Sequence, residues 1–117
     1  MTTLVLVLVL LVAALHLWFL VLEMLLWTKP IGLKTFRNTP EKAEIMRVLA
    51  ANQGLYNGFL VAGLVWSVIA MRTDLALFFL GCVLVAGIFG AATVSRRLFF
   101  VQGLPALLGI VAIVLAH

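Results

Sequence analysis

One acidic side chain, Glu23, lies within an otherwise apolar run near the start of the chain. Between Leu4 and Trp27 only His16 and Glu23 can ionise. A carboxyl in such a run can hold a proton, bind a cation or act as a general acid or base, and an ionisable residue inside a membrane is a functional-site hypothesis by default. His16 precedes Glu23 by seven residues, so a helix would carry both on one face.

Further polar side chains recur in later apolar runs. The candidates for ligand or proton binding are Glu23, His16, Asn52, Gln53, Tyr56, Asn57 and Gln102. Counting residues across a membrane predicts Asn52 and Gln53, together with Gln102, at the level of Glu23. Tyr56 and Asn57 are predicted at the level of His16. These levels predict a polar cluster in the cytoplasmic half of a helix bundle.

The same residues also have a structural interpretation. Glu23 could pair with Arg47 or with an amide, and amides commonly join membrane helices through hydrogen bonds. We predict no metal site and no cofactor. His16 and Glu23 supply two ligands at most, the only other histidine is the last residue, His117, and no metal or nucleotide motif occurs.

Composition requires that lipid surround these residues. The chain has 117 residues, of which 66% are hydrophobic and 10% charged. A water-soluble domain of this size could not hide so much apolar surface, because small domains have much surface for their volume. We predict an all-α, integral membrane four-helix bundle that forms a single domain over residues 1–117. The predicted helices cover about residues 4–27, 40–71, 75–95 and 98–116.

The basic residues give the chain a net charge of +4, but they are confined to the segments between the apolar runs. This arrangement indicates membrane topology and argues against nucleic acid as a partner. Arg47 and the six basic residues of the first and third connections would share one side: Lys29, Lys34, Arg37, Lys42, Arg96 and Arg97. Only Arg72 lies in the second. The positive-inside rule then places both termini on the extracytoplasmic side of the plasma (inner) membrane, with anionic lipid headgroups as an alternative role for these cations.

Two local signals concern helix geometry. Thr39, Pro40 and Glu41 form a helix start, with Thr39 as the N-cap and an acid near the positive end of the helix dipole. Pro105 cannot donate to the carbonyl of Val101, which predicts a kink beside Gln102.

Three segments carry a resemblance to a known family. These are HLWFLVLEMLLW from His16 to Trp27, NQGLYNGFL from Asn52 to Leu60, and QGLPALLG from Gln102 to Gly109. The chain resembles, over essentially its whole length, a family of small bacterial integral membrane proteins catalogued as domain of unknown function 1304. The resemblance implies four membrane helices and no established activity.

The preferred functional hypothesis is a small transporter or ligand-binding membrane protein, homodimeric, in which Glu23 binds a proton or a cationic substrate. One alternative is an intramembrane enzyme acting on a lipid or isoprenoid, with Glu23 and His16 as an acid/base pair. Another is an assembly or regulatory subunit whose polar cluster only holds helices together. The expected partners are the bilayer, a second copy of the chain and a small ligand or lipid. The sequence leaves the protonation state of Glu23 open.

Overall fold

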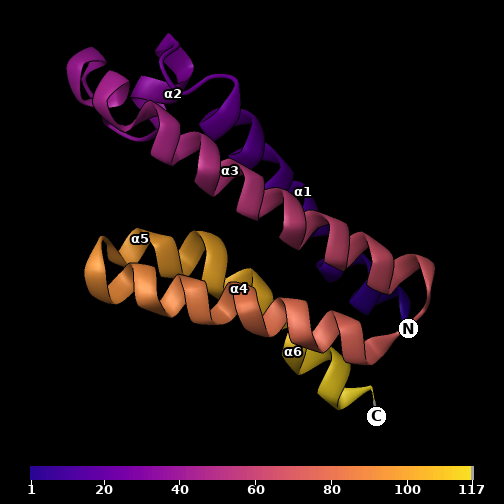
Figure 1. Cartoon of the computed structure of the whole chain (residues 1–117). Coiled ribbons are helices and arrows are strands. Elements are labelled where there is room, and N and C mark those ends of the chain that lie inside the picture. The colour runs from indigo at the N-terminus through magenta and orange to yellow at the C-terminus, as the bar shows by residue number, and fades with distance from the viewer. Residues whose placement is uncertain (117) are drawn as a thin grey trace. The chain divides into compact units, whose positions relative to one another are not determined.

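The computed structural model describes residues 1–116, and His117 lies outside the described residues. Within that range the chain is helical and contains no strand, which confirms the predicted fold class. Figure 1 shows the elements in order: α1 (Thr3–Met24), α2 (Pro30–Thr35), α3 (Pro40–Ile69), α4 (Thr73–Thr93), α5 (Arg96–Leu98), a π-helical turn η1 (Phe99–Gly103) and α6 (Leu104–Leu115).

Four helical stretches are long and apolar enough to cross a membrane. They are Thr3–Met24, Pro40–Ile69, Thr73–Thr93 and Arg96–Leu115, the last comprising α5, η1 and α6. A stretch of about 20 residues spans the roughly 30 Å of a bilayer core. By length and composition these are the spans of a multi-pass membrane protein. One boundary differs clearly from the prediction, because α1 ends at Met24 rather than near residue 27.

The start of α3 follows the predicted signal. Pro40 is the first helical residue and Glu41 lies in the first turn. The Oγ1 atom of Thr39 accepts a hydrogen bond of 3.3 Å from the backbone N–H of Lys42, so Thr39 caps the helix as expected.

The chain divides into two compact units. The first contains Met1–Leu15 and the chain from Leu60 onward, and the second contains His16–Phe59. The core of the first unit is built mainly from Val, Leu, Ile and Ala. Its fully buried members include Val5, Val9, Val12, Leu64, Leu80, Val83, Ala106 and Ile113. Val5, Val9 and Val12 are spaced by four and three residues, so they form one face of α1.

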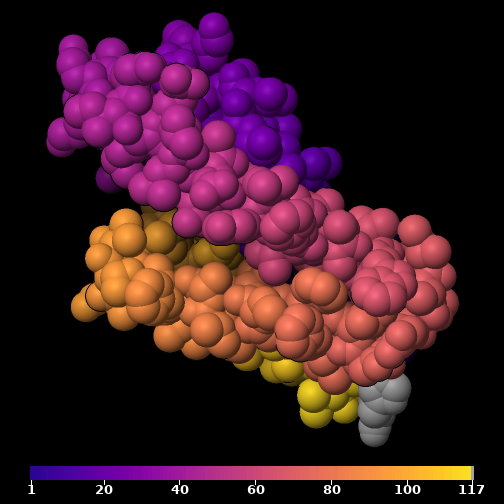
Figure 2. Space-filling view, viewed as in Figure 1, coloured from indigo at the N-terminus to yellow at the C-terminus, as the bar shows by residue number. Residues whose placement is uncertain are grey.

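In the first unit, α4 packs closely against η1 and α6 because glycines leave room. A Cβ atom added at Gly87 would lie 2.6 Å from the backbone nitrogen of Gly103. A Cβ atom at Gly109 would lie 3.0 Å from a methyl group of Leu80. Elsewhere α4, orange in Figure 2, exposes large apolar side chains such as Phe78 and Val85, as a lipid-facing surface does.

The connection between α3 and α4 is a tight reversal. Met71 has a φ of 52°, a left-handed conformation that side-chain-bearing residues seldom adopt. Next to it, Nη2 of Arg72 lies 2.6 Å from Oδ2 of Asp74, and both side chains are exposed. The hydrogen bond to Asp74 raises the pKa of Arg72, so this guanidinium stays charged.

The last span contains a π-helical turn at the place where a kink was predicted. The backbone N–H of Leu104 donates to the carbonyl of Phe99, five residues earlier. Pro105 follows at the start of α6 and has no N–H to offer Val101. The hydrogen-bond ladder therefore widens at this point, and Gln102 lies within the widened turn.

The second unit joins the end of α1 to the first half of α3 through α2. The indole Nε1 of Trp27 donates a hydrogen bond of 2.8 Å to the carbonyl of Ala43, and the ring packs on Phe36 with centroids 5.0 Å apart. Gly32 in α2 is buried against the carbonyl groups of Leu26 and Trp27, where a Cβ atom would clash with the Leu26 oxygen. The segment after α1 is thus held by contacts with α2 and α3.

Candidate functional site

Glu23 lies in the last turn of α1, where this helix meets α3 at two glycines. A Cβ atom at Gly54 would overlap the side chain of Met24 and would lie 3.3 Å from Cβ of Glu23. One turn further along α3, a Cβ atom at Gly58 would lie 3.0 Å from a methyl group of Leu20. The two glycines let the helices approach closely, as small residues four apart do in membrane proteins.

This close approach brings the carboxyl of Glu23 to Asn57, the neighbour of Gly58. The Nδ2 atom of Asn57 donates a hydrogen bond of 2.5 Å to Oε1 of Glu23, and both residues are half-buried. Among residues 1–116, Glu23 makes this side-chain hydrogen bond and no ion pair. The pair joins two predicted site residues that lie 34 positions apart in the sequence.

Arg47 does not neutralise Glu23. Its Nε atom lies 3.3 Å from Oε1 of Glu44, one turn earlier on α3, and both side chains are exposed. Of the two structural partners considered for Glu23, the structure therefore contains the amide and lacks the arginine. Along α3, Asn57 is about 15 Å from Arg47 and about 18 Å from Ile69 at 1.5 Å per residue.

The predicted levels of the amides need correction. Asn52 and Gln53, expected beside Glu23, are exposed on α3, and Asn57, expected at the level of His16, is the actual partner. The partner of Glu23 thus lies about one turn further along α3 than predicted. The shift follows from the early end of α1 and from the helix register that the contact at Gly54 sets, and counting residues could predict neither.

Tyr56 and His16 have contrasting surroundings. Tyr56 is exposed, and its ring lies against Phe59 with centroids 6.0 Å apart. His16 is fully buried, and its ring meets Phe19 edge-on at 5.2 Å. Two helical turns, about 10.5 Å, separate His16 from Glu23 along α1.

Gln102 is half-buried in η1 of the first unit, whereas Glu23 and Asn57 belong to the second. The six connection cations, Lys29, Lys34, Arg37, Lys42, Arg96 and Arg97, are all exposed, and none forms an ion pair within the described part of the chain.

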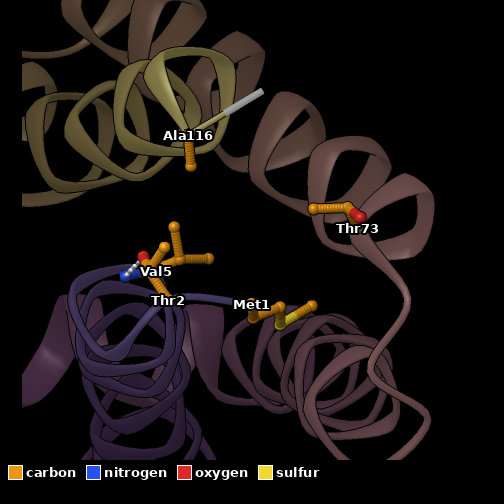
Figure 3. Close-up of a pocket in the computed structure, with 5 residues that line it drawn as sticks. All are labelled: Met1, Thr2, Val5, Thr73 and Ala116. Carbon is orange, nitrogen blue, oxygen red and sulfur yellow. Dashed lines mark hydrogen bonds between the residues drawn. The ribbon is translucent and has the colours of Figure 1, made fainter.

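No group of three or more metal-binding side chains occurs in the described residues. A hollow of about 310 Å³ is lined by Met1, Thr2, Val5, Thr73 and Ala116, none of them a predicted site residue. Figure 3 shows these side chains around the hollow, with the backbone N–H of Val5 donating to Oγ1 of Thr2 at 3.2 Å. The hollow offers two hydroxyl groups and no charged side chain.

The sequence analysis missed the role of Gly54 and Gly58, treating the region only as a source of amides. Two glycines four residues apart in an apolar run were a visible signal for a close helix contact, because this spacing places them on one face. Together with Asn57 between them, the motif would have predicted which amide faces the neighbouring helix.

One family matches the chain: the family described as protein of unknown function (DUF1304) matches residues 10–114. The match covers α3 and α4 completely and most of the first and last spans, so the chain belongs to this family. No curated protein and no solved structure matches the chain.

Proposed function

We propose that this DUF1304 member binds a proton or a cationic small molecule at Glu23, as a small transporter or binding protein of the plasma (inner) membrane. The observation that carries the proposal is a half-buried carboxyl inside an apolar span, with one neutral amide donor and no basic partner among the described residues.

Electrostatics supports this role. A carboxylate removed from water needs a counter-charge and hydrogen bonds, and without them it takes up a proton. Asn57 supplies one hydrogen bond, which is too little to stabilise a full negative charge in hydrocarbon. Glu23 would therefore hold a proton when the site is empty and exchange it for a cation.

Asn57 would act by orienting the carboxyl. Its hydrogen bond holds Oε1 of Glu23 toward α3, which leaves Oε2 for a ligand. The close contact at Gly54 limits movement of the helix backbones around this pair. A proton or cation would thus meet a carboxyl whose direction is fixed before binding.

The orientation in the membrane forms part of the proposal. Arg47 and the six basic residues of the first and third connections would lie in the cytoplasm, with both termini outside. Support comes from the exposure of the six connection cations and from the pairing of the remaining Arg72 with Asp74.

The experiment compares cation binding by two charge-matched variants in lipid nanodiscs. Glu23→Gln removes the charge and keeps an oxygen that can accept from Asn57. Glu41→Gln removes an exposed charge from the first turn of α3 and serves as the control. We expect the wild type and Glu41→Gln to bind tetraphenylphosphonium with release of a proton, and Glu23→Gln to lose both signals.

Binding that is unchanged in Glu23→Gln, or binding without proton release in the wild type, would contradict the proposal. Helical content measured by circular dichroism would establish that the variant is folded. If Glu23→Gln unfolds while Glu41→Gln does not, the carboxyl has a structural role, as expected for an assembly subunit.

A further inference from the structure

Within the second unit, the two sides of α3 have different surroundings. Ala50 and Gly54 are buried, and Gly54 and Gly58 form the contact with α1. Asn52 and Gln53 are exposed, and neither side chain makes a hydrogen bond within residues 1–116. By contrast, every buried side-chain nitrogen and oxygen in the described residues has a hydrogen-bond partner.

An amide side chain in an apolar span needs a hydrogen-bond partner, and the second unit supplies none to Asn52. Asn52 lies about 7.5 Å beyond Arg47 along α3, in the direction of the apolar part of the helix. Lipid hydrocarbon offers no hydrogen bond to an amide. Thr93 on α4 is also exposed, but its hydroxyl has a hydrogen-bond partner on its own helix, because it donates to the carbonyl of Phe89 at 2.7 Å. Asn and Gln side chains, with two donors and one carbonyl, instead join neighbouring helices.

The exposed side chains around Asn52 form a regular stripe, which we call the α3 seam. It consists of Ile45, Leu49, Asn52, Tyr56 and Phe59, all of them exposed. The spacing alternates between four and three residues, which is the repeat of helices that wind around one another. The seam lies opposite the face that carries Ala50, Gly54 and Asn57.

We propose that the α3 seam is the surface through which two copies of this chain pair, with their α3 helices side by side and parallel. Copies that enter the membrane in one orientation have parallel α3 helices, and a twofold axis along the membrane normal brings each seam residue to its own copy. An Asn side chain is self-complementary because its amide both donates and accepts. A single polar residue in such a repeat also fixes the register of the pair.

This interface goes beyond the proposed function and does not depend on it. Glu23 and Asn57 lie on the α1-facing side of α3, so cation binding and pairing are separate properties. Either can fail while the other holds.

Disulfide crosslinking in lipid vesicles tests the seam. The native Cys82 is replaced by alanine, and single cysteines are introduced at Leu49 and Phe59 on the seam. Val85 on α4 is the control, because its side chain is 66% exposed and that of Leu49 is 58% exposed. Disulfides form between residues whose Cα atoms lie within about 7 Å, so we expect several-fold more covalent dimer at both seam positions than at position 85.

Equal crosslinking at all three positions, or none at the seam positions, would overturn the proposal. All three side chains are exposed, so the cysteines remove no buried packing. A dimer at Val85 alone would assign the interface to α4.

Asn52→Leu tests the polar contact separately. Energy transfer between labelled copies, measured while the protein is diluted with lipid, gives the association constant. We expect Asn52→Leu to weaken association about fivefold, the effect of one hydrogen bond between membrane helices, and Asn52→Gln to restore most of it. Association of Asn52→Leu that equals or exceeds that of the wild type would show that the amide faces something other than a second copy.

Discussion

Gly87 provides the sharpest test of how the last two spans pack. A Cβ atom at this position would lie 2.6 Å from the nitrogen and 2.7 Å from the Cα atom of Gly103. Both are backbone atoms, so no change of side-chain rotamer can relieve the overlap. Gly87→Ala must therefore push η1 away from α4.

The size of the effect follows from two opposing terms. Overpacking a close contact costs about 1–3 kcal/mol, and a backbone neighbour favours the upper end of that range. Alanine in place of glycine stabilises a helix by about 1 kcal/mol. We expect Gly87→Ala to lower the free energy of unfolding by about 2 kcal/mol.

Gly81 on the same helix is the matched control, since a Cβ atom there would meet nothing within 4 Å. Gly81→Ala should keep only the gain in helix propensity, about 1 kcal/mol. The assay is unfolding in mixed micelles by increasing fractions of sodium dodecyl sulfate, followed by circular dichroism. If Gly87→Ala proves as stable as Gly81→Ala, the close contact between α4 and η1 is wrong.

Four further substitutions can be measured in the same unfolding assay. Gly54→Ala should lower both stability and cation binding, because the new methyl group displaces the side chain of Met24 beside Glu23. Gly58→Ala should have the smaller effect, because its new methyl group contacts only the end of the Leu20 side chain. Equal effects of the two substitutions would contradict the described register of α1 and α3. Trp27→Phe should lose about 1 kcal/mol with the indole hydrogen bond, and an unchanged unfolding midpoint would indicate that this bond is absent. Met71→Gly should gain about 1 kcal/mol by relieving a positive φ, so a loss would place Met71 in an ordinary conformation.

Hydropathy and local signals predicted much of the fold. Four apolar runs predicted the four spans, because only helices satisfy their own backbone groups in lipid. Thr39 and Pro40 predicted the start of α3 to the residue, because capping depends on the few residues at the helix end. The end of α1 was missed, because Leu25 and Leu26 are as apolar as the residues before them. There the boundary coincides with contacts made by Trp27 and Gly32.

Glu23 and Asn57 were both predicted as candidates, but their pairing was not predicted. Polarity within apolar runs identified both Glu23 and Asn57, since such side chains are few. Which amide meets the carboxyl depends on the sliding register of two helices, which the contact at Gly54 fixes and residue counting cannot supply. The exposure of Asn52 and Gln53 could not be predicted either. Because α3 carries polar residues on both of its sides, the sequence does not show which side faces α1.

The π-helical turn of the last span has a consequence for changes in chain length. A hydrogen bond that reaches back five residues accommodates one residue more than a regular turn, so the side chains after Gly103 are offset by about 100° from an uninterrupted α-helix. Deleting one residue between Phe99 and Gly103 would convert the turn to ordinary α-helix and leave α6 in its present orientation. The same deletion in the middle of α4 would rotate half of that helix and turn its buried glycines toward lipid. Length variation in this span should therefore concentrate at the turn.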